Sequence, residues 1–249
     1  KLATASDDKT AKIWNLENGR TLLTLAGHNS SVWSVAFSPV CPADPAGGKY
    51  LVTGSDDHIV KIWDLETGEA ATTFRGQDEI ASSLAFSPDG KKLATGLSNK
   101  TAKIRDLESG RADLVLEGNG AQVLSVAFSP DGKRLAAGGA GYDDSDNIVK
   151  IWEVQSGRAA LTLEGSGSQV LSVAFSPDGE KLAAGYLEST ARIWNLQSGQ
   201  TMITLEDHHA PVGSVVFSPD GKWLATGSYD KTAKIWNVGS GMAVFTLEG

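Results

Sequence analysis

Apolar and polar residues alternate in short stretches along almost the whole chain, and turns rich in Gly, Pro, Asp and Asn separate the stretches. The segments TLLTL at residues 21–25 and SVAF at residues 34–37 are two examples. Alternation with a period of two predicts β-strands with one buried face. Between the strands, the Pro of a recurring SPDG turn presets φ near about −65°, and its Asp-Gly pair supplies a side-chain acceptor and a left-handed residue. These tight hairpins leave no stretch for a helix, so we expect an all-β fold. The SPDG turns begin at Ser87, Ser129, Ser176 and Ser218.

A pair formed by an aromatic and a polar residue closes an apolar run at regular intervals, with Arg replacing the aromatic residue once. Successive pairs are 49, 42, 47, 42 and 42 residues apart, which indicates one repeating unit with two insertions. Four short strands in a unit of about 40 to 45 residues are typical of a β-propeller blade. The pairs are Trp14-Asn15, Trp63-Asp64, Arg105-Asp106, Trp152-Glu153, Trp194-Asn195 and Trp236-Asn237.

These units resemble WD40 repeats, and the resemblance covers the chain from end to end. In the lettering of that family, strand a is SVAF, strand b is KLATG, strand c is KIW and strand d is TLLTL. Five a strands and six each of the others can be counted, so we expect six repeats, about 23 strands and a first blade without its innermost strand. The resemblance implies one β-propeller domain over residues 1–249. Its blades would span residues 1–25 (incomplete), 27–74, 76–116, 118–163, 165–205 and 207–249.

The incomplete first blade would leave an unpaired strand edge, which natural β proteins normally cover. The chain begins where the residue after an SPDG turn would stand, and it ends where the next corner His would be expected. We therefore expect it to be part of a larger chain. The residues leave open whether the full ring has six or seven blades, and the resemblance favours seven.

The resemblance also implies a chain of hydrogen bonds inside each blade, formed by a corner His, a Ser or Thr of strand b, an Asp of the following turn and the Trp of strand c. Buried indole, hydroxyl and imidazole groups cost free energy when they are unpaired, so a complete set holds the strand register. Two blades have the complete set: His28, Thr53, Asp57 and Trp63, and His208, Thr226, Asp230 and Trp236.

The other blades have partial sets. The first shows Thr4, Asp8 and Trp14. The middle three depart further from the pattern, so we expect mainly packing to hold them. Their residues are Gln77, Thr95, Asn99 and Arg105; Asn119, Ala137, Asp146 and Trp152; and Ser166, Ala184, Glu188 and Trp194.

A repeated Ser or Thr with His and Asp also suggests a catalytic triad, but a nucleophile must be exposed beside a base and an oxyanion site. We expect these groups to be buried, and therefore expect no catalytic residue and no enzyme. The pair His208-His209 lacks further ligands for zinc. The acidic runs at Asp56-Asp57 and at residues 143–146 lack the Gly and the distal Glu of a calcium loop. We expect neither a metal site nor a cofactor.

Function should then lie on the surface, because binding residues concentrate on loops that a rigid scaffold holds. The resemblance implies that the face with the d-to-a corners and b-to-c turns exposes two positions in each blade. These are the residue after the first Val of strand a and the residue before the turn Asp. Trp and Tyr are frequent anchors of interfaces, although single exposed apolar residues are ordinary. We predict a partner-binding patch on this face, formed by Trp33, Leu124, Leu171, Leu187 and Tyr229.

Two insertions lengthen the turns. Residues 40–48 extend an a-to-b hairpin on the opposite face, and their Pro and Gly content predicts an irregular loop. Residues 140–147 extend a b-to-c turn on the binding face, where Tyr142 stands among acidic residues. We add Tyr142 to the predicted patch, where it would face a basic partner. The alternative is a surface loop without a function.

Composition limits the class of protein. The net charge is −8 and the Lys and Arg residues are scattered, which argues against nucleic acid as the main partner. The sequence has no apolar run of 18 residues and no signal peptide, so we expect neither a membrane span nor a membrane partner. Cys41 is the single cysteine, which fits a reducing compartment, and we expect a cytoplasmic protein.

These features favour a non-enzymatic scaffold for protein–protein contacts, or a sensor module, within a larger signalling or regulatory protein. The partner would be a protein or peptide that binds the top face of the propeller. One alternative is an enzyme domain with an active site at the channel mouth, which would need converging titratable groups. Another is a peptide reader, which would need an Arg or Lys cluster at the rim. The predicted surface positions supply few of the former and none of the latter.

Overall fold

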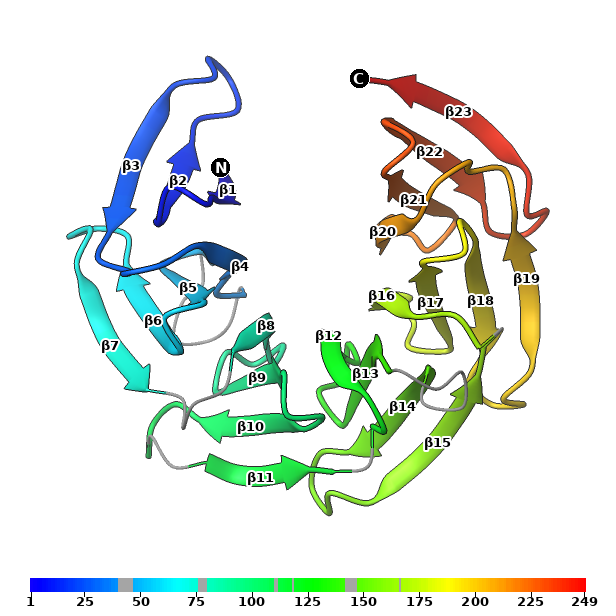
Figure 1. The fold of residues 1–249 in the computed structure, drawn as a ribbon, viewed down its shortest axis with the longest axis horizontal. Coiled ribbons are helices and arrows are strands. Elements are labelled where there is room, and N and C mark those ends of the chain that lie inside the picture. The colour runs from blue at the N-terminus through cyan, green and yellow to red at the C-terminus, as the bar shows by residue number, and fades with distance from the viewer. Residues whose placement is uncertain (40–46, 76–79, 110–111, 118, 142–146, 166) are drawn as a thin grey trace. The chain divides into compact units, whose positions relative to one another are not determined.

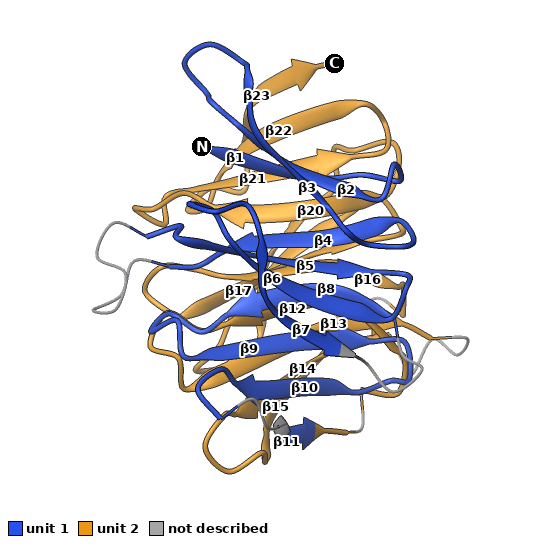
Figure 2. Ribbon diagram, turned by 90° about the vertical axis from the view of Figure 1, so that its left-hand side faces the viewer, with its two compact units in different colours: residues 1–115 blue, residues 116–249 orange. Residues whose placement is uncertain are grey.

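The computed structural model describes residues 1–39, 47–75, 80–109, 112–117, 119–141, 147–165 and 167–249. In these residues the chain forms 23 β-strands and no helix (Figure 1). The strands divide into two compact units, residues 1–115 and 116–249 (Figure 2). Tyr142 and most of both insertions lie outside the described residues. The all-β prediction is confirmed.

Unit 1 contains three antiparallel sheets in which strands consecutive in sequence pair with each other. The first sheet has three strands: β1 (Leu2–Ala5), β2 (Thr10–Trp14) and β3 (Thr21–Ala26). The predicted absence of its innermost strand is therefore confirmed. The second sheet has β4 (Val32–Phe37), β5 (Tyr50–Ser55), β6 (Ile59–Asp64) and β7 (Ala70–Arg75). The third has β8 (Ala81–Phe86), β9 (Lys92–Leu97), β10 (Ala102–Asp106) and β11 (Ala112–Leu116), whose last residue falls at the unit boundary.

Unit 2 contains three four-stranded sheets of the same topology. Their inner strands β12, β16 and β20 follow one another, with the outer strands β15, β19 and β23 at the periphery of the unit (Figure 1). The first sheet has β12 (Gln122–Phe128), β13 (Arg134–Ala140), β14 (Ile148–Glu153) and β15 (Ala159–Glu164). The second has β16 (Val170–Phe175), β17 (Lys181–Tyr186), β18 (Ala191–Asn195) and β19 (Thr201–Leu205). The third has β20 (Val212–Phe217), β21 (Trp223–Ser228), β22 (Thr232–Asn237) and β23 (Ala243–Glu248).

The SPDG turns have the geometry that their residues predict. In each turn the Ser hydroxyl donates to the Asp carboxylate two residues later, for example from Ser87 to Asp89 at 2.5 Å and from Ser218 to Asp220 at 2.6 Å. The turn glycines adopt left-handed backbone, with φ of 70° at Gly90. These hydrogen bonds hold the turn between strands a and b of each four-stranded sheet that has an SPDG sequence.

Each innermost strand carries a β-bulge at the same place. Val32 pairs with Ser55 and Ser34 pairs with Gly54, so Trp33 between them has no partner on β5. The four other innermost strands skip the equivalent residue, and a bulge re-aims the side chain it carries. The skipped residues are Ser82, Leu124, Leu171 and Gly213.

The core of each unit lies between neighbouring sheets. In unit 2, Ala136, Val149 and Ile151 on one face of the first sheet pack against Val170 and other residues of the next sheet. The second and third sheets meet in the same way, and so do the sheets of unit 1. Apolar faces on both sides of a sheet make each sheet depend on its neighbours for stability.

Candidate functional site

A continuous polar network runs through the interior of the β4–β7 sheet. His28 Nδ1 lies 3.0 Å from Asp57 Oδ2, and His28 Nε2 lies 2.7 Å from Thr53 Oγ1. The Trp63 indole N–H donates to the same Thr53 oxygen at 2.8 Å. A Thr hydroxyl that accepts from the indole can donate to Nε2, which leaves Nδ1–H to donate to Asp57. Every polar atom of the set is then paired.

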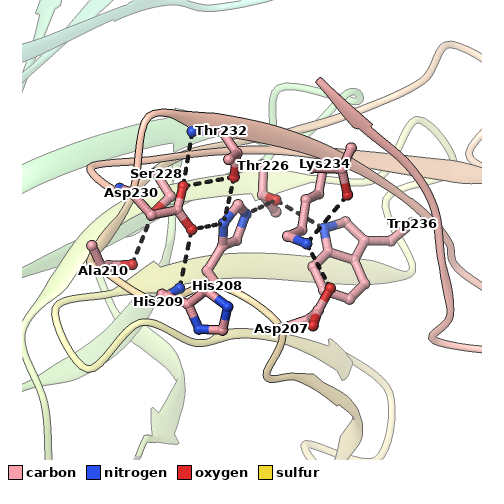
Figure 3. Close-up of polar contacts among 11 residues, drawn as sticks. Asp207, His208, His209, Ala210, Thr226, Ser228, Asp230, Thr232, Lys234 and Trp236 are labelled. Carbon is pink, nitrogen blue, oxygen red and sulfur yellow. Dashed lines mark hydrogen bonds and ion pairs between the residues drawn. The ribbon is translucent and has the colours of Figure 1, made fainter. Parts of the chain in front are cut away.

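The β20–β23 sheet repeats this network (Figure 3). His208 lies 2.7 Å from both Asp230 Oδ2 and Thr226 Oγ1, and Trp236 Nε1 donates to Thr226 at 2.8 Å. Asp230 also accepts from the Thr232 hydroxyl at 2.6 Å. The side chains of His208 and Asp230 are only 1% and 9% exposed. The network therefore holds the sheet together and offers no open reactive centre.

The electrostatics of these networks favour a neutral imidazole beside a charged carboxylate in the β4–β7 sheet. Burial lowers the pKa of His28 below its ordinary value of 6.5, against an opposing effect of Asp57. Burial alone would raise the pKa of Asp57, but hydrogen bonds from the Asn29 backbone, His28 and Ser55 outweigh it and hold that pKa below 3.8. At Asp230, too, burial alone would raise the pKa, but hydrogen bonds, above all the one from the Thr232 side chain, outweigh burial and lower the pKa.

The incomplete sets are held differently. In the first sheet, Trp14 Nε1 donates to Thr4 Oγ1 at 2.8 Å, while Asp8 accepts from Thr10 at 2.6 Å. In the third sheet, the guanidinium of Arg105 lies over the ring of Phe74, 4.6 Å from its centroid. Arg105 stands where the other sheets have Trp at the end of strand c. Its contact with Phe74 joins β10 to β7 of the neighbouring sheet.

An aromatic ring replaces the histidine in the β16–β19 sheet. Tyr186 is fully buried with its ring centroid 6.3 Å from that of Trp194, close to the 6.2 Å between His28 and Trp63. Its hydroxyl has no hydrogen-bond partner among the described residues. Burial raises the pKa of this phenol. Packing of the ring holds this sheet, where Ala184 stands in place of the Thr.

Sequence reasoning missed two polar contributions. Asn147 is buried and joins neighbouring sheets, because its amide donates to Gly167 O at 2.7 Å and accepts from Gly141 N at 2.8 Å.

A basic residue two positions before the aromatic end of strand c lies over a ring, as Lys61 does 5.7 Å from the Trp63 centroid. The sequence signal for this contact is the recurring Lys or Arg directly before Ile-Trp at the end of strand c. Lys234, at this position, lies 2.5 Å from Asp207 (Figure 3).

The predicted surface residues fall into two groups, which the two units carry separately. In unit 1, Trp33 at the β4 bulge is 57% exposed. In unit 2, Leu187 and Tyr229 are 43% and 72% exposed, and Leu124 and Leu171 at the bulges are half-buried. Tyr142, the sixth predicted residue, lies outside the described part of the chain.

The same backbone hydrogen bond holds the second surface position of the β4–β7, β8–β11, β16–β19 and β20–β23 sheets. Leu187 N–H donates to Gln169 O at 3.0 Å, and Tyr229 N–H donates to Pro211 O at 3.0 Å. Each residue is thereby held beside the start of the innermost strand of its own sheet. A Cβ atom at Gly213 would lie 3.7 Å from the Tyr229 ring, so the ring covers bare backbone at the bulge.

Within the described ranges, no group of three His, Cys, Asp or Glu side chains is arranged to hold a metal ion. The same residues contain no helix that is long and apolar enough to cross a membrane.

Repeated antiparallel sheets with buried His–Thr–Trp networks define a class of β-repeat protein in which each sheet is one blade. The model of the family described as "WD domain, G-beta repeat" (WD40) matches residues 19–64, 68–106, 111–153, 157–195 and 199–237. These matches cover well over half of the chain, which therefore belongs to the WD40 family. Each match runs from the outer strand of one sheet to the third strand of the next. The predicted family and fold class are confirmed, and membership implies a scaffold for protein interactions of a generally non-catalytic kind.

Two curated proteins share short segments with the chain. It is 62% identical over 34 residues to "U3 small nucleolar RNA-associated protein 13" of Saccharomyces cerevisiae, a match that covers 14% of this chain and 4% of that protein. It is 49% identical over 51 residues to "Lissencephaly-1 homolog" of Heterostelium pallidum, which covers 20% of this chain and 11% of the relative. The chain thus spans a small part of these relatives, and the similarity is that of single repeats.

Proposed function

We propose that this chain is a non-enzymatic interaction module of a larger signalling or regulatory protein, and that it binds a protein or peptide partner through the bulge-side surfaces of its two units. We define the bulge-side surface of unit 1 as Trp33, and the bulge-side surface of unit 2 as Leu124, Leu171, Leu187 and Tyr229. The exposure of Trp33 and Tyr229 on rigid strand ends carries the proposal. Large aromatic side chains held in place bury much area at a small loss of side-chain entropy.

The alternative of an enzyme has less support. The His, Thr and Asp side chains that resemble a triad are buried and already paired with each other. A nucleophile in such a network has no access to a substrate.

Nucleic acid is also disfavoured as the main partner, because the net charge of −8 repels phosphate. The name of the yeast relative associates that protein with an RNA, but the match covers 4% of it and carries no such role to this chain. We propose a cytoplasmic location, on the basis of the single cysteine.

Affinity capture followed by quantitative mass spectrometry tests the proposed function. The full chain is the bait, and Trp33→Ser and Tyr229→Ser are expected to reduce recovery of a specific partner at least ten-fold. Leu22→Ser and Met202→Ser are matched controls, because these residues are each 47% exposed on the outer strands β3 and β19. Equal loss with the controls, or no loss with either test variant, would contradict the proposal.

A further inference from the structure

A hollow of about 540 Å³ lies between the β16–β19 and β20–β23 sheets, at the end of unit 2 where the SPDG turns are. The start of β19 lines one side of it, and the turns before β21 and after β22 line the other. Ile203 and Leu205 of the first sheet pack with Val238 of the second, so both sides belong to one packed pair of sheets within unit 2. We call this space the turn-side hollow. Its lining includes Lys181, Met202, Ile203, Lys222, Val238 and Gly239.

Gly239 keeps the turn-side hollow open. It follows Asn237 by two residues in the turn after β22, and the turn itself does not require glycine there. Gly239 N–H donates to Asn237 Oδ1 at 3.0 Å, just as Gln197 N–H donates to Asn195 Oδ1 at 2.9 Å, and the φ of Gly239 is not positive. A Cβ atom at Gly239 would meet only Asn237 Oδ1, at 3.3 Å. The other five turns of this kind have Glu or Gln at the same position: Glu17, Glu66, Glu108, Gln155 and Gln197.

A glycine without a conformational reason is typical of a place where another molecule or chain approaches the backbone closely. Comparison with the junction between the β12–β15 and β16–β19 sheets shows that the turn-side hollow also differs in charge and apolar surface. Lys replaces Glu, Gly replaces Gln, and Met replaces Ala. Among the described residues that line the hollow, none is Asp or Glu. The equivalent pairs are Glu180 and Lys222, Gln197 and Gly239, and Ala160 and Met202.

Two lysines of the hollow can bind a carboxylate from another molecule. Lys181 Nζ lies 3.2 Å from Asp178 Oδ2, and Lys222 Nζ lies 4.0 Å from Asp220 Oδ2, with the Lys222 side chain 74% exposed. Ion pairs at the surface are weak and exchange partners readily. The chain as a whole has a net charge of −8. Two lysines beside an apolar wall therefore favour an acidic ligand at this place, while most of the surface repels it.

We propose that the turn-side hollow binds a short acidic peptide segment of a partner protein. One aliphatic side chain of the segment would lie on Met202 and Ile203, in the space that Gly239 leaves open. Neighbouring Asp or Glu side chains would pair with Lys181 and Lys222. The hollow lies at the opposite ends of the strands from the bulges, so this inference is independent of the bulge-side surfaces.

Fluorescence anisotropy of a labelled pentapeptide, Asp-Asp-Leu-Asp-Asp, tests the proposal with the full chain. We expect saturable binding that weakens as the salt concentration rises, because the ion pairs are exposed to solvent. Two control peptides separate the contributions of charge and apolar contact. One has Asn in place of each Asp and the other has Ala in place of Leu, and both should bind about ten-fold more weakly or worse.

Two variants of the chain locate the binding site. Gly239→Gln restores the side chain that Gln197 has in the same turn, so it should leave the unfolding midpoint unchanged and weaken peptide binding about ten-fold or more. Lys222→Glu should weaken binding to a similar degree. Lys133→Glu is its matched control, because Lys133 is exposed at the same position of another SPDG turn and the change in net charge is equal. Trp33→Ser and Tyr229→Ser, which test the proposed function, should leave binding of this peptide unchanged.

Three results would overturn the proposal. The first is equal affinity for the Asp and Asn peptides, or for the Leu and Ala peptides. The second is unchanged affinity in Gly239→Gln or Lys222→Glu, or an equal loss in Lys133→Glu. The third is a dimer in light scattering that Gly239→Gln converts to a monomer, which would assign the hollow to a second copy of the chain.

Discussion

Thr226 is the centre of the β20–β23 network, and replacing it with Val tests whether that network stabilises the fold. The Thr226 hydroxyl accepts from Trp236 and donates to His208, and the residue is 1% exposed. Thr226→Val keeps the shape but leaves an indole N–H and an imidazole nitrogen unpaired. Each buried unpaired group costs about 1–3 kcal/mol. The added methyl group returns roughly 1 kcal/mol, so we expect a loss of about 3 kcal/mol.

Urea unfolding followed by tryptophan fluorescence measures this loss, and exchange of the Trp236 indole proton reports the local effect. Thr204→Val on the outer strand β19 is the matched control, since Thr204 is exposed. Exposed substitutions of this kind usually change stability by less than about 0.5 kcal/mol. Equal free energies of unfolding for the two variants would refute the stabilising role of the network.

Three further predictions concern the interior of the sheets. The pKa of His28 is lowered from 6.5 in the folded chain, so the unfolded chain binds more protons below that pH and the free energy of unfolding should fall as the pH drops below 6.5. In His28→Gln the free energy of unfolding should fall less steeply with decreasing pH. The same steepness in both proteins would exclude His28 as the cause. Tyr186→Phe removes a buried hydroxyl without a partner among the described residues, so thermal unfolding should show a gain of up to about 1 kcal/mol; a loss of that size would reveal a partner. Gly138→Val places a side chain where Val170 lies, and calorimetry should show a loss of at least about 2 kcal/mol; a neutral result would mean that the two sheets separate easily.

Much of the fold could be predicted from local patterns. Strand alternation, SPDG turns and the spacing of the Trp pairs depend on neighbours in the sequence, and they predicted 23 strands and an incomplete first sheet. The His28 and His208 sets could also be proposed, because a buried polar group needs a partner and the family pattern supplies one. The exposure of Trp33 and Tyr229 followed from their places beside corners and turns.

Residues that act between sheets could not be assigned in this way. Nothing in the sequence around Tyr186, at the end of strand b, indicates a special role. Only the packing shows that its ring takes the place of a histidine against Trp194. Asn147 reaches a neighbouring sheet through Gly167, a contact with no local signature. The half-burial of Leu124 and Leu171 likewise depends on what surrounds the bulges, and not on the bulges themselves.

The sequence by itself therefore determined the strands, the turns and the polar partners within a blade, because these depend on alternation, turn chemistry and hydrogen-bond pairing over short distances. Only the tertiary structure decided which faces are covered. Gly185 and Gly227 occupy equivalent positions of strand b, each paired with an Ala of strand c, yet one lies against a neighbouring strand and the other does not. Burial is a property of what packs against a surface, and that partner comes from another part of the fold.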